Sequence, residues 1–262
     1  MRSAQIVLTT LLAVAGCASA PLATQHPAAA HGGAHLAASA SQGRSDTVVR
    51  RTVLLGYSVD HRPIVAEQLG DADNPVRTLV VGCIHGDEPG GLSVVRRLAR
   101  MRALSETDLW LLPDLNPDGR WAGTRVNARG VDLNRNFPYR WRHLGAPGTL
   151  HYSGPRPLSE PESRLAAKLL RRIRPTVAIW YHQALDVVDT SQGPRPLERL
   201  YAAIAGLPTE RLRDYPGSAV GYEDRWFGPS AFVVELPATV TAAVASANTR
   251  AVLRLARSAP AA

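Results

Sequence analysis

The sequence predicts an α/β domain, and three observations indicate this fold class. Short apolar runs typical of buried strands alternate with stretches whose apolar residues recur every three or four positions, as in amphipathic helices. Polar or glycine-rich segments separate these runs. The chain has 262 residues, and removing an N-terminal leader leaves about one domain of ordinary size, which is large enough for a hydrophobic core.

The first elements form an opening hairpin followed by a strand, a helix and a strand. The apolar runs 52–57 and 63–66 flank a turn-like segment, which predicts the hairpin. A strand over 77–85 leads into a helix over about 90–101, and the next strand covers about 109–115.

The segment 116–158 is too polar and glycine-rich to predict regular structure. Loops of this length usually carry function, so we expect functional residues here.

The second half of the chain continues the alternation. Ser159-Glu160-Pro161-Glu162 is interpreted as a capping box that starts a helix. A strand follows over 176–183, then a helix near 197–204 and a strand that ends at Glu235. Residues 240–255 have apolar side chains at helical spacing, so a last helix is expected to pack on one face of the sheet.

Residues 1–20 have a short apolar core after Arg2, which is typical of a secretory leader. Two cleavage interpretations compete. The small residues before Cys17 resemble a bacterial lipoprotein site, in which Cys17 becomes the acylated N-terminus. Ala18-Ser19-Ala20 offers an ordinary signal-peptidase site instead, although Pro21 directly after it is unfavourable. Either interpretation predicts an exported protein, which is a cell-envelope lipoprotein in the first case and a secreted protein in the second. The only membrane contact expected is the lipid at Cys17 of the lipoprotein.

Composition adds three expectations. Residues 21–46 are rich in Ala, Gly, Ser and His without periodicity, which predicts a disordered tether. The formal charge of +8 comes almost wholly from arginine, and no basic residues interleave with aromatics, so no nucleic-acid partner is predicted. With Cys17 lost or lipidated, Cys83 has no disulfide partner and is expected to be a small core residue.

His85 and Glu88 stand three residues apart where a strand-like run breaks into a glycine-rich turn. An imidazole and a carboxylate placed there can hold two corners of a tetrahedral zinc site. His182 ends a second apolar run, and residues at the carboxyl edge of a buried strand face the ligand crevice of α/β proteins, so we expect it to be the third ligand. Two histidines and one glutamate leave a coordination position open, which is the catalytic form of a zinc site.

Further motifs follow in order: Asn116-Pro117-Asp118-Gly119, then Asp132-Leu133-Asn134-Arg135, then Glu235 at the end of an apolar strand. With His85-Gly86-Asp87-Glu88, their order and spacing resemble those of the zinc metallocarboxypeptidase family, the carboxypeptidase A-like peptidases. The resemblance runs from about Tyr57 to the C-terminus. Within that family the chain is most similar to the bacterial murein peptide amidase branch.

This resemblance implies that residues 47–262 form a carboxypeptidase-like catalytic domain, a three-layer α/β/α sandwich with a central mixed sheet. It implies one Zn²⁺ per chain, held by His85, Glu88 and His182, with Glu235 as the general base. The expected reaction is hydrolysis of an amide bond next to a free C-terminal carboxylate in a peptide. In this branch that bond is the γ-D-glutamyl–diaminopimelate bond of cell-wall murein. Burial behind four apolar residues is expected to raise the pKa of Glu235 toward the working range, although a strand-end glutamate can also simply face solvent.

The resemblance also implies that Asn134 and Arg135 bind the substrate carboxylate, since a guanidinium matches a carboxylate bidentately. A structural salt bridge is the alternative role for Arg135. Arg125 matches the arginine that stabilises the oxyanion, but Arg129 lies close enough in sequence to be confused with it.

Two positions stay open. Asp132 is expected either to orient a ligand imidazole or to cap a turn. The family uses a mobile tyrosine that closes over the substrate, and neither Tyr215 nor Tyr222 has a spacing that fits cleanly.

Three other functions compete with the murein peptidase. One is a zinc deacylase of the desuccinylase or aspartoacylase type, which shares part of the motif set. Another is a general exported carboxypeptidase. The third is a catalytically inactive wall-binding module, which the presence of every expected ligand and of the base argues against.

Overall fold

The computed structural model describes residues 48–102 and 104–258. The expected leader, residues 1–20 with Cys17, and the expected tether, residues 21–46, lie outside the described residues. Within the described ranges, no helix has the length and apolar character needed to cross a membrane.

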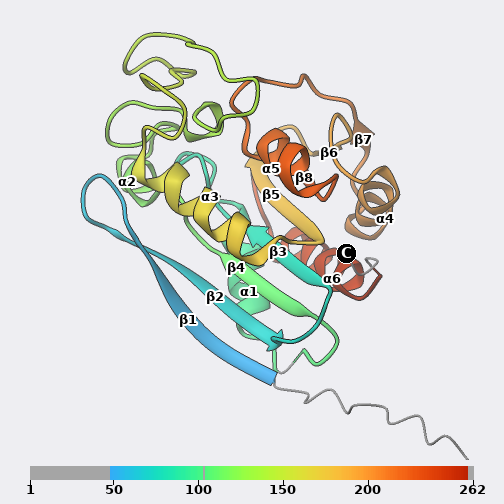
Figure 1. The fold of residues 1–262 in the computed structure, drawn as a ribbon. Helices are drawn as coiled ribbons and strands as arrows, with labels where there is room; N and C mark the ends of the chain where they lie inside the picture. The colour runs from blue at the N-terminus through green and yellow to red at the C-terminus, as the bar shows by residue number, and fades with distance from the viewer. Residues whose placement is uncertain (1–47, 103, 259–262) are drawn as a thin grey trace, which may run out of the picture. The chain divides into compact units, whose positions relative to one another are not determined.

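The described residues form a mixed sheet of eight strands in the order β1-β2-β4-β3-β5-β8-β6-β7 (Figure 1). Strands β3, β4, β5 and β8 run parallel where they pair with one another, whereas the β1–β2, β2–β4 and β6–β8 pairs are antiparallel. The strands are β1 (Val48–Tyr57), β2 (Pro63–Asp71), β3 (Arg77–Val81), β4 (Asp108–Leu112), β5 (Val177–Gln183), β6 (Val187–Asp189), β7 (Thr209–Glu210) and β8 (Ala231–Leu236).

Helices cover both faces of this sheet (Figure 1). One hydrophobic core joins one face of the sheet to α1, α4 and α6, and a second joins the opposite face to α3 and α5. The helices are α1 (Gly91–Ala99), α2 (Pro117–Ala122), α3 (Pro161–Ile173), α4 (Arg195–Ala205), α5 (Ala219–Phe227) and α6 (Ala242–Ser258). The expected three-layer α/β/α sandwich is therefore confirmed.

The central strands show why their sequences read as continuous apolar runs. Successive side chains of a strand point to opposite faces. In β5, Ile179 and Tyr181 enter one core, while Ala178 and Trp180 enter the other. Because helices cover both faces, both sets must be apolar.

The segment 116–158 departs from the sequence prediction. It contains α2 and a short 3₁₀ turn, η1 (Leu133–Arg135), so the expectation of no regular structure is wrong at these two places. The α2 helix begins because the Asn116 side chain accepts a hydrogen bond from the Gly119 amide and Pro117 occupies the first turn. The strands β6 and β7 and the helix α5 are also additions to the predicted elements.

The start of α3 also differs from the predicted capping box. Glu160 is the N-cap residue and its side chain makes no capping hydrogen bond, while Pro161 begins the helix. The Ser159 hydroxyl donates to the Glu160 carboxylate instead of accepting a hydrogen bond from a helix amide. The helix forms where it was predicted, but the residues that begin it differ from the predicted capping box.

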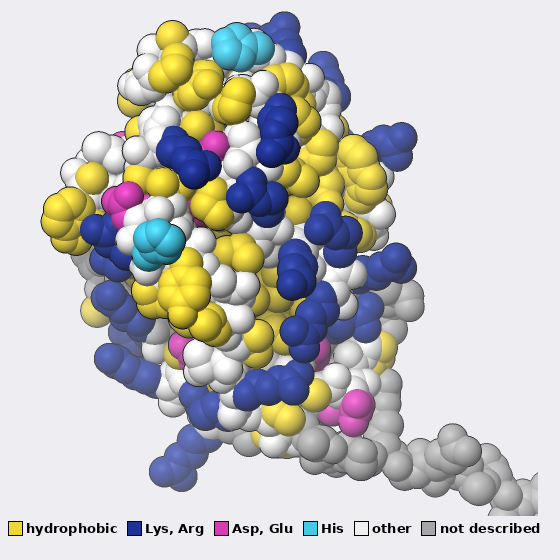
Figure 2. Space-filling model, turned by 60° about the vertical axis from the view of Figure 1, so that its left-hand side comes forward, with side chains coloured by type: hydrophobic (Ala, Val, Ile, Leu, Met, Phe, Trp, Pro, Cys, Tyr) yellow, Lys and Arg dark blue, Asp and Glu magenta, His cyan; other side chains and the backbone are white. Residues whose placement is uncertain are grey.

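Basic side chains dominate the charged surface in Figure 2, where many Lys and Arg side chains and few acidic ones are visible. They are spread over this face among apolar and polar side chains. This distribution agrees with the formal net charge of +8.

Candidate active site

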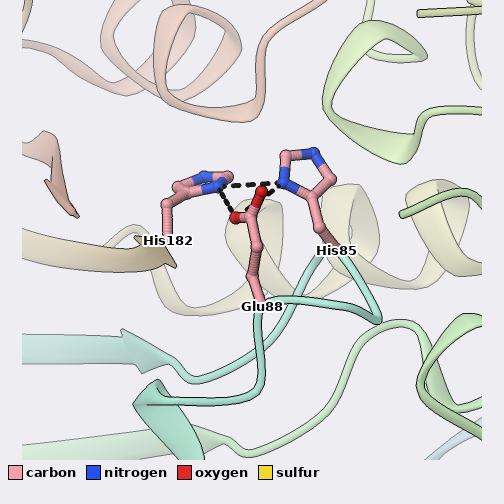
Figure 3. A group of neighbouring side chains, drawn as sticks. All are labelled: His85, Glu88 and His182. Carbon is pink, nitrogen blue, oxygen red and sulfur yellow. Dashed lines mark hydrogen bonds and ion pairs between the residues drawn. The ribbon is translucent and has the colours of Figure 1, made fainter. Parts of the chain in front are cut away.

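His85, Glu88 and His182 converge at the carboxyl edge of the sheet (Figure 3). His182 lies in β5, and His85 and Glu88 lie in the turn between β3 and α1. The Nδ1 atoms of the two histidines are 3.0 Å apart, and both lie within 3.0 Å of Oε2 of Glu88. One ligand atom from each residue lies within 4.8 Å of the others, so the three side chains can hold one metal ion.

The partners of His85 decide which nitrogen faces this cluster. Nε2 of His85 lies 3.1 Å from Oδ1 of Asp132, a fully buried carboxylate. A carboxylate accepts a hydrogen bond only from a protonated ring nitrogen, so the Nδ1 lone pair is left to face Glu88 and His182. This lone pair and the Glu88 carboxylate lie next to Nδ1 of His182. Two imidazole nitrogens and a carboxylate oxygen are the donor set of a zinc site. The residues present fit the metal that the sequence predicts.

The turn that presents His85 and Glu88 depends on a glycine. A Cβ atom at Gly86 would lie 2.0 Å from the backbone carbon of Gly119 in α2. Only glycine allows the turn to lie this close to α2.

Asp132 performs both roles that the sequence left open. Besides contacting His85, Oδ1 accepts a hydrogen bond from the Asn134 amide and so caps η1. Burial alone would raise the pKa of Asp132, but His85, His151 and Arg125 lower it well below its ordinary value. Asp132 thus holds part of the long loop against the metal cluster through its contacts with His85 and Arg125.

Arg125, and not Arg129, reaches the cluster. Its guanidinium donates to Oε1 of Glu88 at 2.8 Å and to Oδ2 of Asp132 at 3.1 Å. Arg129 lies instead 3.6 Å from Glu160, with 56% of its side chain exposed. The geometry therefore separates the two arginines that the sequence could not.

Arg135 is buried, and none of the described residues serves as its counter-ion. Only 5% of the residue is exposed, and no carboxylate of the described residues lies within ion-pair distance of it. One terminal nitrogen donates to the Asn134 carbonyl at 2.7 Å, and Nε has no hydrogen-bond partner in the described structure. Burial lowers the pKa of this guanidinium. An anion entering the pocket would supply the missing partner, so the alternative of a structural salt bridge is not what this structure shows.

Asn134 connects this arginine to the metal cluster. Its side-chain oxygen accepts a hydrogen bond from the Ala219 amide at 2.9 Å, which fixes the orientation of the side chain. Its side-chain nitrogen lies 3.4 Å from Nε2 of His182. Asn134 thus stands between the expected carboxylate-binding group and one of the expected metal ligands.

Glu235 lies beside the cluster on β8. It pairs in register with His182 of β5, so the two side chains leave the same end of neighbouring strands. Oε2 of Glu235 is buried and has no hydrogen-bond partner in the described structure. Burial raises the pKa of Glu235 above its ordinary value, and the negative charge of Glu88 raises it further. The predicted direction of this shift agrees with the structure.

A pocket of about 390 Å³ joins these groups. The seven residues expected to bind zinc, act in catalysis or bind the substrate all line it: His85, Glu88, Arg125, Asn134, Arg135, His182 and Glu235. Tyr215 also lines the pocket, whereas Tyr222 is buried in the core beside Phe137 and Trp226. Of the two tyrosines that the sequence left open, only Tyr215 is placed to meet a ligand.

Among the further residues that line this pocket is His151, for which the sequence predicted no role. Its only signal is its position in the long loop that was expected to carry function.

A mixed sheet that presents a histidine–glutamate–histidine cluster and a buried glutamate in one pocket defines a metallohydrolase site. The profile of the zinc carboxypeptidase family, peptidase M14, matches residues 40–193. The chain therefore belongs to the zinc carboxypeptidase family. Glu235 lies beyond the matched segment, and its place in the site rests on the pairing of β8 with β5.

Relatives with known names agree with this membership. Murein peptide amidase A of Escherichia coli K12 is 32% identical over 122 residues, which cover 42% of this chain and 50% of that protein. Gamma-D-glutamyl-L-diamino acid endopeptidase 1 of Lysinibacillus sphaericus is 25% identical over 182 residues, which cover 55% of this chain and 46% of that protein. The chain thus spans about half the length of these relatives.

A solved structure extends the likeness over most of the described fold. The murein-tripeptide amidase of Escherichia coli O157 superposes with a TM-score of 0.66 at 25% identity, covering 79% of this chain and 91% of that one.

Proposed function

We propose that this protein is a zinc-dependent peptidase that hydrolyses the amide bond next to a free C-terminal carboxylate. Its substrate on this proposal is a cell-wall peptide with a γ-D-glutamyl–diaminopimelate bond. The observation that carries the reaction class is Arg135. This buried guanidinium has no counter-ion among the described residues, and it lies in the pocket that also holds the metal cluster and Glu235.

Substrate binding begins at Arg135. A carboxylate is the anion whose geometry fits a guanidinium fork, and its entry would end the isolation of this buried charge. Asn134, fixed by the Ala219 amide, offers a further donor beside it. A peptide anchored there by its C-terminus places its last amide bond toward His85, Glu88 and His182.

Glu235 is the general base of the proposed reaction. It takes a proton from the water that attacks the amide carbonyl and passes it to the departing amine. When bound by His85, Glu88 and His182, zinc supplies the Lewis acid that polarises the carbonyl and makes water acidic near neutral pH. Arg125, already directed at the cluster, stabilises the oxyanion.

The names of the relatives support the substrate. One relative is named for murein peptide and another for the γ-D-glutamyl-diamino acid bond. We further propose that the protein is exported, anchored through Cys17 or secreted, so that it meets such peptides. The surface rich in Lys and Arg in Figure 2 would favour approach to anionic wall polymer.

A substrate panel tests this proposal. Zinc-loaded protein is incubated with the wall tripeptide L-alanyl-γ-D-glutamyl-diaminopimelate, with ordinary L-peptides and with N-acyl amino acids, and the products are identified by mass. We expect release of diaminopimelate from the tripeptide. Trimming of L-peptides alone would indicate a general carboxypeptidase, and cleavage of N-acyl amino acids alone would indicate a deacylase. Both results contradict the proposed substrate.

A further inference from the structure

Tyr215 and His151 meet across the pocket from different loops. Their rings are stacked, with centroids 6.4 Å apart and an interplanar angle of 23°. This separation lies within the range of offset-stacked aromatic pairs. His151 belongs to the 141–158 part of the long loop and Tyr215 to the loop that precedes α5.

The loop of His151 is fixed at the carboxylate that contacts the metal cluster. The Asp132 amide donates to the carbonyl of Tyr152, the residue after His151, at 2.8 Å. Nδ1 of His151 lies 3.5 Å from Oδ2 of Asp132. Although 57% of its side chain is exposed, this imidazole is therefore held in place by Asp132 on the side away from the solvent.

The loop of Tyr215 is fixed on the other wall. Gly217 has a φ of +78°, and a Cβ atom there would lie 2.0 Å from the carbonyl oxygen of Arg135. Its amide donates to the Tyr139 carbonyl, and its carbonyl accepts from the Phe137 amide. The backbone two residues after Tyr215 is thus fixed beside Arg135, while Tyr215 as a residue is 36% exposed.

The ring of Tyr215 covers the group that binds the carboxylate in the proposed function. The guanidinium carbon of Arg135 lies 4.2 Å from its centroid, and that of Arg213 lies 5.2 Å from it. None of the hydrogen bonds described for this structure involves the Tyr215 hydroxyl. The described contacts of this side chain are therefore made by its ring, and His151 supplies the aromatic one.

We propose that His151 is a positioning residue whose imidazole supports the Tyr215 ring and holds it over Arg135. This inference rests on the proposed function, because a tyrosine held over Arg135 would cover a bound C-terminal carboxylate. The ligand concerned is therefore the same peptide, and His151 affects how tightly the pocket binds it.

A mutant cycle with a ligand-free readout tests the inference. The proteins are the wild type, His151→Ala, Tyr215→Ala, the double variant and His151→Phe. The matched control is His143→Ala, because His143 lies in the same loop and its ring meets Tyr152 rather than Tyr215. Zinc content and thermal unfolding are measured for all six proteins to confirm that each is folded and loaded.

The ligand-free readout is the rate at which tetranitromethane nitrates Tyr215, mapped by peptide mass. We expect His151→Ala to raise this rate at least twofold, and His151→Phe and His143→Ala to leave it unchanged. An unchanged rate in His151→Ala would overturn the inference. This arm needs no substrate, so it decides the inference even if the wild type fails to cleave wall tripeptide and the proposed function is wrong.

The second readout is the split between KM and kcat for wall tripeptide. Loss of one stacked pair should raise KM by about two- to tenfold in His151→Ala, with a smaller change in kcat. In the Tyr215→Ala background the same substitution should change KM by less than twofold, and His151→Phe should restore the wild-type value. If His151→Ala acts equally in both backgrounds, His151 contacts the substrate directly and does not act through Tyr215.

Discussion

Replacement of Arg135 by lysine should weaken substrate binding without loss of zinc. A guanidinium offers a carboxylate two parallel hydrogen bonds, whereas an ammonium acts as a point charge. Arg135 is only 5% exposed, so water has little access to replace the lost donor. A hydrogen bond to a charged group contributes about 1.5–3 kcal/mol, and loss of one corresponds to about a 10- to 150-fold rise in KM.

The assay is steady-state hydrolysis of a peptide with a free C-terminus, with zinc content measured in parallel. Arg129→Lys is the matched control, because Arg129 lies in the same loop, pairs with Glu160 and does not line the pocket. We expect its KM to change by less than threefold. A fall in kcat at unchanged KM for Arg135→Lys, or an equal effect in the control, would refute the role assigned to Arg135.

The remaining predictions concern the base, the buried carboxylate behind the metal cluster and one acid outside the pocket. Glu235→Gln should retain zinc but lose turnover by several orders of magnitude, and near-normal activity would exclude it as the base. Asp132→Asn should weaken zinc affinity or activity about 10- to 100-fold, as measured by competition with a chelator, because His85 loses its orienting partner. Burial, with neighbouring carboxylates, raises the pKa of Glu198 in α4 to about 8, and both its oxygens lack partners in the described structure. Because the pKa of Glu198 is higher in the folded state, the wild-type free energy of unfolding should fall relative to that of Glu198→Gln as pH rises from 5 to 8. The expected fall is on the order of 2 kcal/mol. A difference between the two proteins in chemical denaturation that does not change with pH would contradict this.

Residues at strand ends could be predicted from the sequence for a physical reason. An apolar run that is buried on both faces marks a central strand, and the first polar residue after it emerges at the sheet edge. His182 and Glu235 are both of this kind, and the register that pairs them follows from the adjacency of β5 and β8. His85 and Glu88 could be predicted in the same way, because they lie in the turn that directly follows the strand β3.

Residues in loops could not be separated in this way. Arg125 and Arg129 lie in the same irregular segment, and the path of that segment depends on contacts between distant residues, such as Gly86 against Gly119. The choice between Tyr215 and Tyr222 depended on α5, which was not predicted and which buries Tyr222. The approach of His151 to Tyr215 is a meeting of two loops that no local pattern specifies.

The capping box before α3 shows the limit of a local motif. Ser159 and Glu162 have the spacing of a capping box. The Glu162 side chain is buried instead, and it accepts hydrogen bonds from the Val59 amide and the Asn127 side chain. Ser159 pairs with Glu160 instead. Tertiary contacts overrode the local preference, although the helix itself formed as expected.

The requirement for a free C-terminal carboxylate is tested most directly by comparing wall tripeptide with the same tripeptide carrying a C-terminal carboxamide on its diaminopimelate. Zinc-loaded protein is given each peptide, and the products are measured by mass over time. We expect the free acid to release diaminopimelate, and we expect a chelator to stop the release and zinc to restore it. The carboxamide should lower kcat/KM at least about 10-fold because Arg135 loses its anion. Equal cleavage of the two peptides, or cleavage that survives complete removal of the metal, would contradict the proposed reaction.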